Sequence, residues 1–126
     1  MLSRGLIAGH WRKDARAQDD IRRHTPRFQG ANADANLALA EALRKVAEPR
    51  GISVAQAAIA WVTAQGDDII PLIGARRRDQ LAEALRALDV TLSPTDTAAM
   101  EIAVPRGAAV GLRYPEAAMA ALDSER

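Results

Sequence analysis

The chain has 126 residues, a formal net charge of +1 and 48% hydrophobic residues, values that fit one globular domain. The balanced charge gives no reason to expect a nucleic-acid or membrane partner, and the absence of cysteine excludes disulfides, a thiol nucleophile and cysteine-ligated zinc. No apolar run approaches the ~18 residues of a membrane helix and the first residues lack a signal-peptide pattern, so we expect a cytoplasmic protein.

The first strong structural signal is helical. Residues 1–30 are polar, basic and contain glycines, which is typical of a loop with a solvated surface. From residue 31 to residue 48 the apolar side chains recur at helical spacing and share one face: Leu37, Ala40, Leu43 and Ala47. Pro49 and Gly51 then end this predicted helix.

A second predicted helix follows, to about residue 65, and it is apolar nearly all round. Ser53 and Gln56 form the capping-box pattern that marks its start. A helix of this composition must pack on more than one side, and we expect Trp61 to lie in the core.

Residues 69–73 form a short apolar run that we interpret as a buried strand of a parallel sheet. Gly74 and three arginines, Arg76 to Arg78, follow it and lead into a predicted helix over residues 77–88. A helix start offers free N–H groups and the positive end of the helix dipole, and arginines pair with phosphate oxygens. The pattern therefore predicts a phosphate site. The alternative is a turn glycine before a solvated, positively charged helix start.

A helix over residues 93–104 and a short one over residues 115–122 complete the pattern. The chain thus holds about five helices and one credible strand. A strand without a neighbour leaves backbone groups unpaired, at about 1–3 kcal/mol for each buried group. We therefore expect that another polypeptide completes the sheet or that the chain is a piece of something larger.

Several motifs resemble, in the same order, the C-terminal third of an aldo-keto reductase of the bacterial and plant type. Residues 54–62 are similar to the seventh helix of that family, and residues 71–77 to its eighth strand and phosphate-binding turn. The other resembling segments are 3–9, 20–23, 26–28, 36–37 and 113–116. Together these segments extend over about residues 2 to 119.

The resemblance implies an α/β fold, the (β/α)8 TIM barrel, of which this chain holds only the C-terminal part. That part is mainly helical, with about five helices and one barrel strand. The implied organisation is a loop after strand seven (1–30), helices (31–65), the last strand (69–73), the nucleotide-binding turn and helix (74–88), and a C-terminal helix and tail (94–126).

The resemblance also implies an oxidoreductase, because the family reduces an aldehyde or ketone by hydride transfer from NADPH. NADPH and a carbonyl compound are then the expected partners. The family's catalytic tetrad of Asp, Tyr, Lys and His lies on earlier barrel strands. Tyr114, His10 and His24 do not match those positions, and no catalytic residue and no metal ligand is assigned.

The cofactor-binding residues implied by the resemblance are Ser3, Arg4, Gly74, Ala75, Arg76, Arg77 and Gln80. Arg77 matches the basic residue that pairs with the 2′-phosphate of NADPH. Arg76 assists it, and Gln80 faces the same phosphate. An arginine fork that holds a phosphate through two hydrogen bonds is the physical reason for this residue type.

The remaining cofactor positions contact other parts of the nucleotide. Gly74 and Ala75 match backbone contacts to the adenosine end, and Ser3 and Arg4 match the loop over the pyrophosphate. Ala84 stands where the family usually has an asparagine that hydrogen-bonds the adenine.

Three hypotheses follow for the chain as a whole. It is the terminal portion of a truncated NADPH-dependent reductase, or a subunit that completes a split barrel with an N-terminal partner. The third hypothesis is a non-catalytic helical interaction module that self-associates through its exposed strand.

Overall fold

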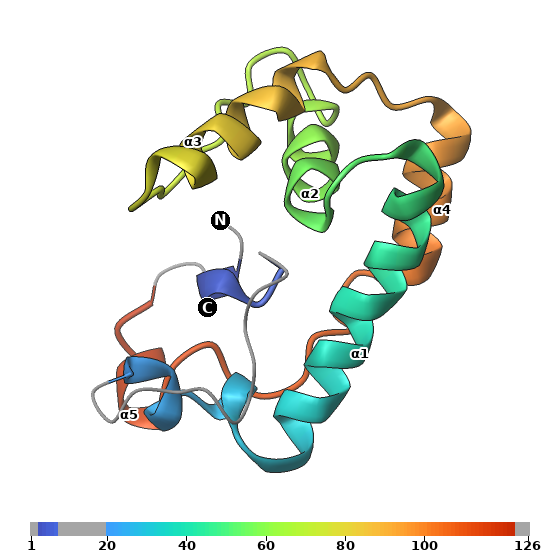
Figure 1. Ribbon diagram of the computed structural model, residues 1–126. Helices are drawn as coiled ribbons and strands as arrows, with labels where there is room; N and C mark the ends of the chain where they lie inside the picture. Colours follow the sequence, from blue (N-terminus) through green and yellow to red (C-terminus); the bar gives the residue numbers. More distant parts are fainter. Residues whose placement is uncertain (1–2, 8–19, 123–126) are drawn as a thin grey trace.

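A computed structural model describes residues 3–7 and 20–122, and within these residues the chain is helical (Figure 1). The α-helices are α1 (Gly30–Ala47), α2 (Val54–Thr63), α3 (Arg78–Leu85), α4 (Pro94–Ala103) and α5 (Glu116–Met119). Short 3-10 helices lie between them: η1 (Ser3–Gly5), η2 (Ile21–His24), η3 (Pro26–Phe28), η4 (Glu48–Arg50) and η5 (Arg86–Asp89). No helix of the described residues is long and apolar enough to cross a membrane.

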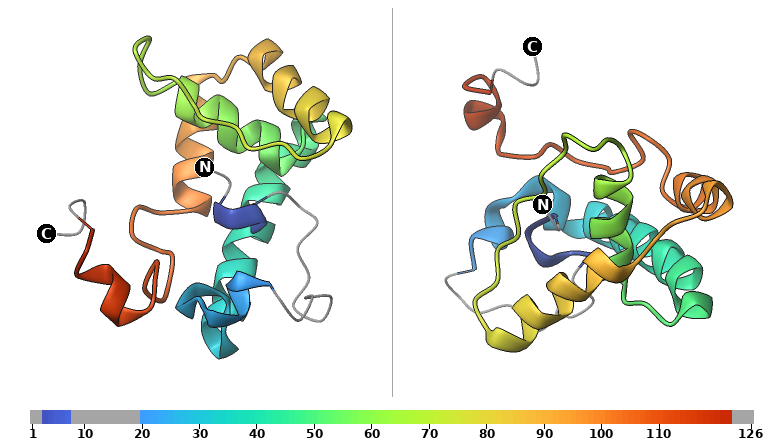
Figure 2. Two further views of the ribbon diagram at one scale, coloured as in Figure 1. Left: turned by 90° about the vertical axis from the view of Figure 1, so that its left-hand side faces the viewer. Right: turned by 90° about the horizontal axis from the view of Figure 1, so that it is seen from above.

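Helix α1, with 18 residues, is the longest helix of the described part of the chain, and several other elements pack against it (Figures 1 and 2). It packs beside α4, and near its C-terminal end it contacts α2, which in turn contacts α3 and η5. The short element η3 contacts α1, and η1 lies at the level of the middle of that helix (Figure 1). An ion pair between Arg50 and Asp96 joins η4, which follows α1 directly, to the first turn of α4.

The predicted helix at residues 31–48 is confirmed as α1, and its end follows the expected chemistry. Gly51 adopts φ +65°, a left-handed conformation that glycine reaches without strain, and its N–H donates to the Glu48 carbonyl. The predicted inner face is also present, since Leu43 and Ala47 are buried while Leu37 and Ala40 are half-buried.

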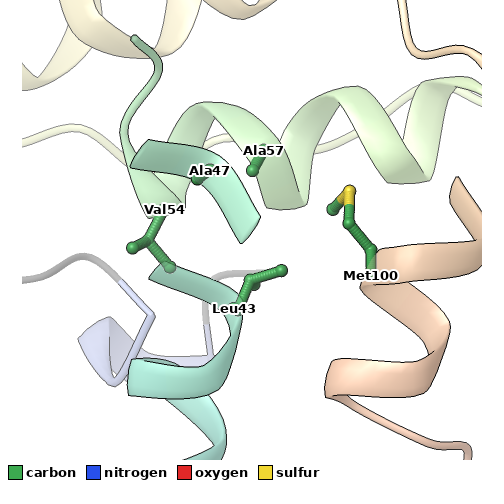
Figure 3. Packing of buried hydrophobic residues seen from close by; sticks show 5 residues of the cluster. All are labelled: Leu43, Ala47, Val54, Ala57 and Met100. Atoms are coloured by element: carbon green, nitrogen blue, oxygen red, sulfur yellow. The ribbon is translucent and has the colours of Figure 1, made fainter. Parts of the chain in front are cut away.

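The core forms where α1, α2 and α4 meet (Figure 3). Its buried members are Leu43, Ala47, Val54, Ala57 and Met100. The small alanines let the helix backbones approach closely, so a few large side chains fill the space between three helices. Trp61 packs against this cluster and is only half-buried, at the edge of the core rather than inside it.

Helix α2 is packed on more than one side, as its composition predicts. Its start is the predicted capping box: the Ser53 hydroxyl accepts from the Gln56 N–H, and the Gln56 side chain accepts from the Ser53 N–H, at 3.2 and 2.9 Å. Beyond the first cluster, Ile59 packs with Ala84 and Ala87 in a second one. This second cluster seats α3 and η5.

The predicted strand at residues 69–73 does not form in the structure. The segment is irregular, and the described residues contain no strand. A strand exists only through ladder hydrogen bonds, and no second extended segment of the described chain pairs with this one. As a result Ile70 and Leu72 are 84% and 83% exposed rather than buried.

The three later predicted helices are present with small changes. The helix expected at residues 77–88 becomes α3 followed by the 3-10 turn η5. Helix α4 begins after Ser93, whose hydroxyl accepts from the Asp96 N–H, and α5 is the short helix of the tail.

Replacing Met100 with alanine should destabilise the fold strongly. Met100 is 5% exposed in the central cluster, and removing such a side chain leaves a cavity that costs about 2–5 kcal/mol. The matched control on the same helix is Ile102→Ala, because Ile102 is 80% exposed and its removal should change the free energy of unfolding by less than about 0.5 kcal/mol. Urea unfolding of the three chains measures both values, and equal losses would contradict this core.

Candidate cofactor-binding site

The segment before α3 brings three of the predicted site residues together. The Gln80 side-chain oxygen accepts from the backbone N–H groups of Arg76 and Arg77, each at 3.2 Å. This contact folds the turn onto the first turn of α3 and fixes where the arginines leave the backbone. Two of the N–H groups that the sequence predicts for an anion are therefore already bonded within the chain.

Arg77 is held by a neighbouring carboxylate. Its Nε and Nη2 donate to the two carboxylate oxygens of Asp79, at 3.0 and 2.6 Å. Hydrogen bonding between the two side chains is the main reason that the pKa of Asp79 lies below its ordinary value and the pKa of Arg77 above its own. The two side chains are largely exposed, at 61% and 65%, so the pair orients the guanidinium fork in solvent.

The flanking arginines are differently placed. Arg76 and Arg78 are exposed, and neither side chain makes an ion pair with another residue of the described ranges 3–7 and 20–122. Arg76 therefore offers an uncommitted guanidinium next to the oriented one of Arg77, which is the arrangement needed to hold an anion with several oxygens.

Gly74 lies in open space. A side chain added there would meet no atom within 4 Å, and its backbone is outside the left-handed region. The chain's own packing thus sets no requirement for glycine, and the turn-glycine alternative gains no support. Ala75 is also exposed, so the backbone of both residues is accessible to a bound molecule.

Ala84 faces the protein interior. It is 9% exposed and packs in the second cluster with Ile59 and Ala87. The methyl group therefore fills a place in the α2–α3 contact.

Ser3 and Arg4 line a cavity of about 500 Å³. The Arg4 guanidinium lies over the Tyr114 ring, 4.4 Å from its centroid, and Arg4 Nη1 donates to Thr25 Oγ1 at 3.1 Å. None of residues 74–80 lines this cavity. The structure thus does not bring the two groups of predicted residues into one cavity, and the site stays a prediction.

One buried polar residue that lines this cavity, Asn36, has a structural role that the sequence analysis did not predict. Asn36 is 1% exposed, and its amide donates to the carbonyls of Arg27 and Val110 and accepts from the Val110 N–H. These bonds fasten the chain after α4 to α1. The available signal is an amide at helical spacing with Leu43 and Ala47 on an otherwise apolar face.

The described residues contain no group of three or more His, Asp or Glu side chains placed to hold a metal ion. Two residues that do not match the family's catalytic tetrad are described by the structure. The Tyr114 ring is covered by the Arg4 guanidinium, and His24 lies exposed at the end of η2. His10 lies outside the described residues.

Known proteins match this chain over most of its length. The sequence profile of the Aldo/keto reductase family matches residues 1–105. The chain belongs to that family. It is 36% identical over 118 residues to a Schizosaccharomyces pombe protein named aldo-keto reductase yakc (NADP(+)), which covers 93% of this chain and 35% of the relative.

A second relative is the probable aldo-keto reductase 1 of Glycine max. It is 34% identical over 113 residues, which are 90% of this chain and 33% of the relative. The chain thus spans about a third of the length of these relatives. No solved structure matches it.

Replacing Arg77 with glutamine should raise the pKa of Asp79 toward its ordinary value, because the hydrogen bond that favours the carboxylate is removed. An NMR titration of the Asp79 carboxyl with pH measures this. Arg76→Gln is the control and should leave the Asp79 titration nearly unchanged. An Asp79 pKa that moves equally in both variants would show that general positive charge, not the Arg77 fork, sets it.

Proposed function

We propose that this chain carries the NADPH-binding part of an aldo-keto reductase, an oxidoreductase that reduces a carbonyl compound. The observation that carries the proposal is the arginine turn after residues 69–73, folded onto α3 by Gln80. Support comes from the family membership and from the relative whose name includes NADP(+). When bound, NADPH supplies the hydride for the reduction.

Arg77 and Arg76 would hold the 2′-phosphate. Arg77 already has a bidentate anion partner in Asp79, so its fork is oriented for two oxygens before a ligand arrives. A phosphate monoester carries more negative charge than one carboxylate and offers three acceptor oxygens. It would therefore displace Asp79 from Arg77 and also engage Arg76. Exposed Gly74 and Ala75 leave room for the adenosine end.

The alternating exposure of residues 70–73 supports a place in a barrel. Ile70 and Leu72 are strongly exposed, whereas Pro71 and Ile73 are half-buried and Ile73 packs on the second cluster. This alternation is that of a strand with helices on one face. We propose that the segment becomes the last barrel strand when neighbouring strands pair with it, and that the catalytic groups come from those earlier strands.

The experiment that tests cofactor binding is a fluorescence titration of the chain with NADPH and with NADH. The unmodified chain should prefer NADPH, and Arg77→Gln should reduce that preference roughly ten-fold, since charge-assisted hydrogen bonds to the 2′-phosphate are lost. The effect should come from weaker NADPH binding, with little change for NADH.

Arg78→Gln removes the same charge one residue later and is the matched control. It should leave the preference for NADPH nearly intact. Equal binding of the two nucleotides by the unmodified chain would contradict the proposal. A chain that oligomerises and binds neither nucleotide would instead favour the helical interaction module.

A second experiment tests the barrel. Supplying the N-terminal portion of a family barrel as a separate polypeptide should produce carbonyl-dependent NADPH oxidation. Ile70→Asp should abolish this NADPH oxidation, because an unpaired charge would be buried in the assembled barrel, either between strands and helices or in the barrel interior. Ile102→Asp places the same charge at an equally exposed residue of α4 and should be tolerated. Equal activity of both variants would contradict the strand assignment.

A further inference from the structure

The two ends of the described chain meet at one contact, and the residues there are held in an unusual conformation. Ser3 and Arg4 have φ of +46° and +56°, in the left-handed region that side-chain-bearing residues rarely adopt. Such a conformation persists only where surrounding contacts hold it. Three contacts do so at Arg4: those to Thr25, to Tyr114 and to Arg22.

The contacts engage different parts of Arg4. Arg22 Nη1 donates to the Arg4 carbonyl at 3.1 Å, and Arg22 is itself fixed by the carboxylate of Asp20. Arg4 Nη1 donates to the buried hydroxyl of Thr25, while the flat face of the guanidinium lies on the Tyr114 ring. A guanidinium has five N–H donors, and stacking on a ring uses none of them.

The tail that brings Tyr114 to this place is itself anchored. Asn36 bonds Val110 through both ends of its amide, and Arg27 Nε donates to the Gly111 carbonyl at 3.0 Å. Gly111 has φ +82°, and a side chain there would stand 2.8 Å from Asn32 Nδ2 and about 3.1 Å from the backbone of Pro26. Residues 110–114 thus follow a fixed path to Arg4.

We infer that Tyr114 is a positioning residue for Arg4, and that the tail is a strap that holds the Ser3–Gly5 turn in a phosphate-binding conformation. The ring face fixes the plane of the guanidinium and Thr25 fixes one of its edges. The remaining N–H groups are then available to an oxyanion. That this oxyanion belongs to the cofactor's pyrophosphate rests on the proposed function; the contact between strap and turn does not.

The test compares the full chain with Tyr114→Leu and Tyr114→Phe. A proton above an aromatic ring is shifted upfield in NMR, so the Arg4 side-chain protons should be shifted in the unmodified chain and in Tyr114→Phe. In Tyr114→Leu they should return to random-coil values while the signals of α1 and α2 persist. NADPH titration should show binding weakened roughly two- to five-fold in Tyr114→Leu and unchanged in Tyr114→Phe.

Each outcome decides the inference. Random-coil shifts of Arg4 in the unmodified chain would overturn the strap. If the unmodified chain binds NADPH, equally tight binding by Tyr114→Leu would overturn it too. If the unmodified chain binds no NADPH, the proposed function fails for this chain. The Arg4 shifts then still decide the strap, since they require no nucleotide.

Discussion

The structure depends on the burial of α2 on two sides. One side of this short helix supplies Val54 and Ala57 to the cluster shared with α1 and α4, and Ile59 on another side seats α3 and η5. Gln56 reinforces the second contact, since its Nε2 donates to the Glu83 carbonyl of α3 at 3.2 Å. The arginine turn precedes α3 directly, so the packing of α2 is what places the candidate phosphate-binding residues on the molecule.

The electrostatics of that turn suit exchange of one anion for another. Asp79 orients the Arg77 fork, yet the pair is largely exposed, and exposed ion pairs contribute little to stability. A phosphate that replaces the carboxylate therefore meets a weak competitor and a guanidinium already pointed outward. Arg76 has no such partner among the described residues and adds its charge without first breaking a contact.

The features predictable from the sequence are those set by neighbours along the chain. Helix α1 and the Ser53 cap follow from spacing within a few residues, and the structure contains both. The strand predicted at residues 69–73 is absent from the described residues, because strand pairing requires a second extended segment. The contact between Arg4 and Tyr114 joins opposite ends of the chain, so no local pattern could indicate it.

Helix α1 links the two halves of the candidate site. Near its start, Asn36 fastens the tail that carries Tyr114 to Arg4, and near its end Leu43 and Ala47 join the core that positions α2 and α3. A straight helix of 18 residues separates these points by a nearly fixed length. The distance between the Ser3–Gly5 turn and the arginine turn is thus set largely by α1. In the proposed barrel, further strands would pair with the backbone of residues 69–73 and would bring one nucleotide into reach of both turns.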